Sequence, residues 1–534
     1  MGQKKKYSKR KRLIFRTKKL SKRKIQDGGP HEINDSDDEW VDKTSDNVLN
    51  ESISASKITG NLSEDNDDAI QPGFILMQFI CLSEYLSKFL PCPDCKCIGH
   101  LEVSVNLQAA QGFGHQVKAY CNNCESESVL FTTSKRCQHT ELLTGKKLPM
   151  EANVRMVSFV RSIGKGYAAL EHFSKHLNSP APMSKSNYNN IMSLKHSAAK
   201  RVAKESMKAA ADEVTLKAGT DVAVSVDGSW QRRGHVSNNG IVTVISVNTG
   251  KCLDAEIMSK GCERWKDKED SPEYELWLLE HDCQINHTGS AGSMESAGAI
   301  RIFSRSVEQY GLRYVQYLGD GDSASYKSVV NSNPYDCDIE KLECVGHVQK
   351  RTGSRLRKLK QKEKLGGAGK LTEGKIDTLQ NYFGIAIRQN VGDLVSMQQN
   401  AQATLYHVAS TDDRPDHTSC PMDSWCGWHN DPNNYKHRHG LPAEIVSLIE
   451  PIYHDLCDES LLKKCLHGQT QNANECLNKV VWDHCSKNVF VGRDTLEEAV
   501  YSSVSLFMPA ADGSRKTRNA TQKRFSVVFA PRVR

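Results

Sequence analysis

The sequence predicts an α/β protein of the α+β kind, and two observations lead to that class. Between residues 221 and 362, three short alternating stretches are followed by helical and strand-like stretches in the order β-β-β-α-β-α-β-α. Further upstream, four cysteines form two Cys-x-x-Cys pairs with twenty-five residues between them. The chain has 534 residues, which is long enough for about three domains. We therefore expect one main sheet and a small domain that is stabilised by a bound metal ion.

Shifts in composition and periodicity divide the chain into segments with different expected roles. Residues 1–69 are expected to be a disordered tail that is basic and then acidic, 70–140 a zinc-ribbon-like domain, and 141–218 a helical domain that is compatible with a helix-turn-helix DNA-binding module. The first part of the α/β core spans 219–362, a helical insertion spans 363–468, and the core is completed by 469–510. Residues 511–534 form a basic tail.

The two ends of the chain are far more basic than its middle. Thirteen Lys or Arg and no acid lie between Lys4 and Lys24, a composition that cannot bury enough apolar area to fold. This arm is typical of nuclear localisation or nucleic-acid contact, with a solvated charged end as the alternative. The longest apolar run, 74–81, is too short for a membrane span, and no secretory signal follows the basic start. We expect a nuclear protein without a membrane partner, whose 18 cysteines are metal ligands or buried thiols.

The paired cysteines are the first motif that carries chemistry. Cys92 with Cys95 and Cys121 with Cys124 are spaced so that each pair forms a tight turn that presents two thiolates, as a tetrahedral structural zinc site requires. The alternating stretch 101–108 between the pairs predicts a strand of a zinc ribbon. Four nearby residues could replace a ligand: Cys97, His100, Cys137 and His139.

Three helices are expected between Glu151 and Val214, with Ser184 as the N-cap of the third. Their short connections are compatible with a helix-turn-helix module in which Lys195, Lys200 and Arg201 face a DNA groove. A plain helical linker domain is the alternative.

Acidic residues lie at the ends of two expected core strands. Asp227 ends the stretch that begins at Asp221, and Asp320 and Asp322 follow the stretch 313–319. Carboxylates at the ends of neighbouring strands converge on one edge of a sheet, where they can hold two divalent cations for phosphoryl transfer. A third carboxylate from a later helix would complete the set. The chain has no P-loop, HExxH, GxSxG or GxGxxG motif in a suitable context, which argues against those nucleotide-binding and hydrolytic chemistries.

Several segments, in this order, resemble the Mutator-like transposases of eukaryotic DNA transposons, from about Val222 to Phe507. They are VSVDGSW, SAGSMESAGAIRIFSRS, YLGDGDS, LECVGHVQKR, LQNYFGIAIR, STDDRPDHTSCPMDSWC and LLKKCLHGQTQNANECLNKVVW. The resemblance implies an RNase H-like catalytic core with a helical, Cys/His-containing insertion, a DDE triad and two catalytic Mg²⁺ or Mn²⁺ ions.

The resemblance also assigns roles to single residues. Asp227 is the first acid of the triad and Glu475 the third. Asp320 is preferred to Asp322 as the second acid, because it is the first carboxylate after the strand. A Cys-x-x-His of the family is matched by Cys344 and His347, which would position the metal edge or the scissile phosphate, or only pack.

The implied function is a DNA transposase that binds transposon terminal repeats and target DNA as a homo-oligomer and catalyses strand cleavage and strand transfer. Two alternatives remain open: a catalytically inactive, domesticated nuclear DNA-binding protein, and an RNase H-like nuclease without strand transfer.

Two further groups of cysteine and histidine fall within this region. His407, His417, Cys420 and Cys426 would suit a zinc ion that staples the insertion. The second group is Cys262, His281, Cys283 and His287. Relatives often carry a Cys-x-x-Cys pair where this chain has only Cys262, which argues against a full zinc site there unless His281 is recruited.

Basic residues are dense just after the Cys-x-x-His motif. Those expected to grip the DNA backbone are Lys350, Arg351, Arg355, Arg357 and Lys358. Acids are nearly absent from this stretch, so the local sequence suggests that the charges cannot all be paired; a solvated helix face is the alternative.

Overall fold

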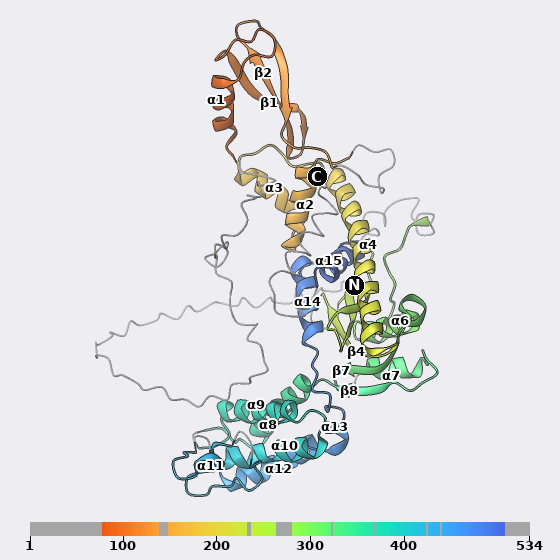
Figure 1. Cartoon of the computed structure of the whole chain (residues 1–534), viewed down its shortest axis with the longest axis vertical. Helices are drawn as coiled ribbons and strands as arrows, with labels where there is room; N and C mark the ends of the chain where they lie inside the picture. The colour runs from red at the N-terminus through yellow and green to blue at the C-terminus, as the bar shows by residue number, and fades with distance from the viewer. Residues whose placement is uncertain are drawn as a thin grey trace, which may run out of the picture. The chain divides into compact units, whose positions relative to one another are not determined.

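The structure is a computed structural model of the chain (Figure 1). It describes residues 77–137, 148–231, 237–262, 280–321, 324–367, 369–422, 426–437 and 440–507. The expected tails at 1–69 and 511–534, and the candidate residues His139 and Asp322, lie outside these residues. Within the described ranges, none of the helices combines the length and the apolar character that a bilayer crossing needs.

The first described elements form a small sheet with one helix. They are α1 (Phe79–Phe89), β1 (Leu101–Gln111), β2 (Gly114–Cys121) and β3 (Glu127–Thr132). The strands pair antiparallel in the order β1-β2-β3, so the strand expected from residue 101 is present as β1. Leu101 pairs with Cys121, which brings the turn before β1 beside the turn after β2. Each turn holds one cysteine pair.

Three helices follow, as expected: α2 (Glu151–Ser162), α3 (Tyr167–His176) and α4 (Lys185–Ala218). The Ser184 hydroxyl accepts a hydrogen bond of 3.3 Å from the backbone N–H of Asn187, so Ser184 is the N-cap of α4.

A mixed sheet forms the centre of the described core. Its strands are β4 (Asp221–Trp230), β5 (Asn239–Ser246), β6 (Cys252–Ser259), β7 (Arg313–Gly319) and β8 (Glu340–Glu343). Their order in the sheet is β6-β5-β4-β7-β8. The first three form the expected antiparallel meander, whereas β7 pairs parallel with β4, and β8 with β7. The mixed α/β class is therefore confirmed.

Helices cover both faces of this sheet, which explains why every residue of β5 is buried. Val242 and Val244 pack with α6 (Ser293–Tyr310) and α7 (Ala324–Asn331). Ile241 and Ile245, on the opposite face because strand side chains alternate, pack with α14 (Asn472–His484) and α15 (Arg493–Leu506).

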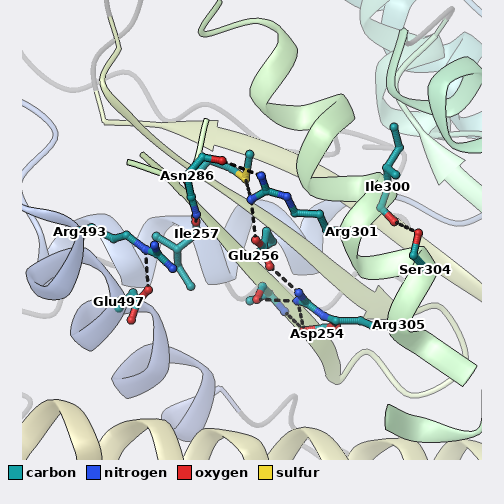
Figure 2. A network of polar contacts seen from close by, with 12 residues as sticks. Asp254, Glu256, Ile257, Asn286, Ile300, Arg301, Ser304, Arg305, Arg493 and Glu497 are labelled. Atoms are coloured by element: carbon teal, nitrogen blue, oxygen red, sulfur yellow. Dashed lines mark hydrogen bonds and ion pairs between the residues drawn. The ribbon is translucent and has the colours of Figure 1, made fainter. Parts of the chain in front are cut away.

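Ion pairs attach α6 to the edge strand β6 (Figure 2). Arg305 donates hydrogen bonds of 2.8 Å to each carboxylate oxygen of Asp254 and also contacts Glu256. One turn earlier, Arg301 Nη1 lies 3.1 Å from Glu256. The carboxyl group of Asp254 is buried, and bidentate pairing of this kind constrains geometry as well as adding energy. The orientation of α6 relative to the sheet is thereby held from its middle and C-terminal turns.

A group of helices lies between β8 and α14 in the chain and has its own apolar core (Figure 1). These helices are α8 (Val345–Lys362), α9 (Glu373–Gln389), α10 (Leu394–Ala409), α11 (Gly427–Asn430), α12 (Ala443–Leu456) and α13 (Glu459–Lys463). After them the chain returns to the sheet as α14, so an element late in the sequence lies against β4.

Candidate active site and metal-binding clusters

The register of two parallel strands brings Asp227 and Asp320 to the same edge of the sheet. Ser225 of β4 pairs with Leu318 of β7, and this is the last pair between the two strands. Two residues further along each chain come Asp227, within β4, and Asp320, one residue beyond the end of β7. The first strand was expected to end at Asp227, but β4 continues to Trp230 because it stays paired with β5.

Helix α14 is attached to β4 by polar side chains along one of its faces. Four of them donate hydrogen bonds: Gln471 to Val226 O (2.8 Å), Asn474 to Ser225 O (3.2 Å), Asn478 to Asp227 Oδ2 (2.7 Å) and Trp482 to Ser229 Oγ (2.8 Å). Buried amide groups of this kind are costly unless they are paired, so they select one docking position of the helix. The sequence carries a signal for this face that was not used above, because Asn and Gln recur there at helical spacing.

The docking of α14 brings Glu475 to the acids of the sheet, with His347 between them. The imidazole Nδ1 lies 3.5 Å from Asp320 Oδ1, and Nε2 lies 3.8 Å from Glu475 Oε1. Glu475 is also close enough to Asp227 for its charge to raise the pKa of that carboxyl group. Asp320 and Glu475, 155 positions apart in the chain, therefore border one imidazole. Asp227 lies close enough for the charges of His347 and Glu475 to act on its pKa. All four residues lie within the described ranges.

Asp227 is the most enclosed of the three acids. Burial raises its pKa to about 6, and the negative charge of Glu475 adds to the effect. The positive charge of His347 and the hydrogen bond from Asn478 act in the opposite direction without cancelling the rise. A nearby cation would therefore stabilise the ionised form of this carboxyl group.

A fourth carboxyl group, Glu295 in the first turn of α6, belongs to the same site and was missed from the sequence. A Cβ atom on Gly228 would lie 2.8 Å from Glu295 Cγ, so the glycine beside Asp227 leaves room for this side chain. Burial and the charges of Asp227 and Asp320 raise the pKa of Glu295 to about 7. With Asp320 it lines a cavity of about 320 Å³. The sequence signal that could have indicated Glu295 is an acidic residue in the first turn of α6, the helix that packs against β4.

Cys344 and His347 act on each other at the start of α8. Burial would raise the pKa of the Cys344 thiol, but hydrogen bonding and the charge of His347 outweigh it and lower the pKa. The pKa of His347 is raised, mainly by its hydrogen bond to Cys344. The Cys344 sulfur also accepts a hydrogen bond of 3.3 Å from the backbone N–H of Gln471. The motif therefore joins α8 to the start of α14 and lies inside the site.

The basic residues of α8 have more acidic partners than the local sequence suggested. Arg351 lies 2.6 Å from Glu343, and Arg355 lies 3.5 Å from Asp455. Arg357 contacts Glu373 at 3.1 Å and also Asp377. These acids come from β8, α9 and α12, so only the fold could reveal them.

Two of the five basic residues keep more freedom for a ligand. Lys350 is exposed and lies 3.8 Å from Glu475, at the acidic site itself. Within the described residues, Lys358 has no ion pair and is solvent-exposed. The DNA-binding assignment of this helix stays a prediction.

The assignment of Lys195 to a DNA groove is wrong. Its side chain is buried and ion-paired with Glu498 of α15, which also contacts Arg161 of α2 at 3.3 Å. A buried carboxylate needs such partners because desolvation is costly. Lys195 therefore joins the helical segment to the core and does not face a groove.

The four cysteines of the ribbon motif come together. Their sulfur atoms all lie within 4.8 Å of one another: Cys92, Cys95, Cys121 and Cys124. Cys97 is also near, with its sulfur 3.0 Å from that of Cys95, so it remains a possible replacement ligand. A group of four thiols at this separation could hold a tetrahedral zinc ion.

The second predicted cluster is also assembled, and it is wholly buried: His407, His417, Cys420 and Cys426. The Nδ1 atoms of the two histidines are 3.1 Å apart, and Cys426 Sγ lies 3.4 Å from His417 Nδ1. The other ring nitrogen of His417 contacts His437 at 2.9 Å, and His437 contacts Asp412 at 2.7 Å. Such outer contacts orient a ligating imidazole, so this cluster has both the ligand set and the support that zinc binding uses.

Comparison with known protein families gives a match. The sequence model of the Mutator-like transposase family matches residues 73–426, which is more than half of the 534 residues. The matched region contains Asp227, Asp320 and His347 and ends before Glu475. Among curated protein sequences, none matches the chain significantly. The chain belongs to the Mutator-like transposase family.

Proposed function

We propose that this protein is a DNA transposase that binds transposon ends and catalyses strand cleavage and strand transfer with Asp227, Asp320 and Glu475. The observation that carries the proposal is that carboxylates from the end of β7 and from α14 border one histidine, while the carboxylate of Asp227 on β4 lies near enough for Glu475 and that histidine to shift its pKa. The sheet supports an RNase H-like core, because three antiparallel strands are followed by two strands parallel to the first.

The chemistry of the donor set fits divalent cations. Asp227 and Glu295 are half-buried beside other carboxylates. Burial first and the neighbouring negative charges second raise their pKa values, and a cation would offset both effects. Oxygen ligands of this kind suit Mg²⁺ or Mn²⁺. Asp227, Asp320 and Glu475 would hold the ions, with Glu295 as a further oxygen donor. When bound, two such ions activate the attacking oxygen and stabilise the leaving one.

The other residues of the site would orient these carboxylates and the DNA. Asn478 holds one oxygen of Asp227 and leaves the other for a cation. His347 separates Asp320 from Glu475 and would move toward a phosphate when cations neutralise those acids. Lys350, exposed beside Glu475, would contact the DNA backbone.

The same proposal covers the partners and the location of the protein. We propose double-stranded DNA, as terminal repeats and as target, bound by a homo-oligomer in the nucleus. The basic arm between Lys4 and Lys24 would direct nuclear import or contact DNA. The two four-residue clusters, Cys92 to Cys124 and His407 to Cys426, would hold structural zinc.

A nicking and joining experiment tests the function. The purified full chain is incubated with Mg²⁺ or Mn²⁺, a plasmid that carries the inverted repeats flanking its coding sequence, and a second target duplex. We expect metal-dependent cleavage and joining to the target. Asp227→Asn, Asp320→Asn and Glu475→Gln should each lower the rate about a thousandfold. Glu205→Gln, an exposed acid on α4, is the matched control.

The outcomes separate the candidate functions. Cleavage without joining would identify a nuclease, and binding without cleavage would identify a DNA-binding protein derived from a transposase. Full activity of Asp227→Asn or Glu475→Gln would refute the assignment of the site.

A further inference from the structure

A third group of potential metal ligands lies beyond β6, away from the clusters described above. The ligand atoms of Cys262, His281 and Cys283 all lie within 4.8 Å of one another. Cys262 is buried, His281 is half-buried and Cys283 is exposed. Residues 263–279, which separate Cys262 from the other two, lie outside the described residues.

The fold brings these residues together through contacts that need no metal. The backbone N–H of Asn286 donates a hydrogen bond of 3.0 Å to Ser259 O, and the backbone N–H of Ser259 donates one of 2.7 Å to Asn286 Oδ1. The Asn286 side chain also donates to Ile257 O at 2.7 Å, and Arg301 donates to Asn286 O at 2.6 Å (Figure 2). Asn286 is therefore fixed to the end of β6.

The spacing on each side of this anchor then determines which residues meet. Cys262 follows Ser259 by three residues, and Cys283 precedes Asn286 by three residues. Cys262 and Cys283 therefore leave the same anchor by equal chain lengths, and His281 lies on the same segment as Cys283. The ligand atoms of the three residues accordingly lie within 4.8 Å of one another.

We propose that Cys262, His281 and Cys283 bind a zinc ion that links the end of β6 to the segment before α6. Two thiolates and one imidazole are a ligand set that zinc prefers, and they leave one coordination position for solvent. The exposed position of Cys283 gives that fourth position access to water. The ion would tie Cys262, which follows β6, to His281 and Cys283, which precede α6.

Zinc counting on the full-length protein tests the proposal. Metal is measured by inductively coupled plasma mass spectrometry after removal of loosely bound ions. We expect Cys283→Ser and His281→Ala each to lower the zinc content by one equivalent per chain. Cys337→Ser, an exposed cysteine outside the three clusters, should leave it unchanged.

A second variant separates loss of a ligand from loss of folding. Cys283→His replaces one zinc ligand by another and should keep the wild-type zinc content. In the cobalt-substituted protein, Cys283→Ser should lower the sulfur-to-metal charge-transfer absorption per chain, since one thiolate ligand is removed. Unchanged zinc content in both Cys283→Ser and His281→Ala would overturn the proposal. So would a Cys262–Cys283 disulfide found by mass spectrometry in the purified protein.

Discussion

The buried cluster of the insertion and the carboxylate site at the sheet are built in opposite ways. The ligands of the cluster, His407 to Cys426, lie within twenty residues of one another in the chain. The carboxylates Asp227 and Glu475 are separated by more than two hundred residues and meet only because α14 docks on β4. A short separation lets a metal assemble its own site, whereas a long one makes the site depend on the core.

This difference predicts which part of the protein each substitution damages. Changes in the cluster should act on stability, while changes at the sheet should act on chemistry with little effect on folding.

The largest effect is expected for Cys426→Ser. Loss of this buried ligand should release zinc from the insertion and lower its free energy of unfolding by about 4 kcal/mol or more. Urea unfolding followed by tryptophan fluorescence, together with zinc content, measures this. Cys81→Ser, an exposed cysteine, is the control. Equal stability of Cys426→Ser and wild type would show that the cluster holds no structural metal.

Asn478→Ala should impair catalysis. The substitution frees the Asp227 carboxylate from its 2.7 Å hydrogen bond, so its orientation toward a cation is lost. We expect the nicking rate to fall about 10- to 100-fold with unchanged zinc content. Lys479→Ala, the exposed neighbour on α14, should retain activity. A loss shared by both variants would point to the helix and not to the hydrogen bond.

Glu295→Gln tests the carboxyl group that sequence reasoning missed. As an oxygen donor beside Asp227 and Asp320, its loss should raise the Mg²⁺ concentration for half-maximal nicking about tenfold. A titration with Mg²⁺ measures the shift, with Glu308→Gln at the exposed end of the same helix as control. An unchanged metal dependence would place Glu295 outside the metal edge.

The smallest effect concerns a long-range contact without metal, the buried Glu498. Burial tends to raise its pKa, but Lys195 and Arg161 outweigh burial and lower the pKa below the ordinary 4.5. Its charge therefore stabilises the fold above pH 4.5, and this stabilisation is lost as the pH falls through the folded-state pKa.

Comparison of wild type with Glu498→Gln measures this contribution. The free energy of unfolding of wild type should fall more steeply between pH 6 and pH 3 than that of the variant. Parallel curves would show that Glu498 titrates alike in the folded and unfolded chain.

The sequence determined by itself what depends on neighbours in the chain. Periodicity predicted the strands and helices of the core, and spacing predicted both four-ligand clusters, because a turn or a short loop is enough to bring such ligands together. Asp227, Asp320 and Glu475 could be named from the resemblance, but their meeting could not be derived from their positions.

Only the tertiary structure decided what depends on packing between distant segments. Glu295 reaches the site because Gly228 leaves room for it, and Lys195 is buried because Glu498 lies opposite. Partners for the arginines of α8 come from β8, α9 and α12. The physical reason is that burial and electrostatic pairing depend on which surfaces meet, and a local stretch of sequence does not contain that information.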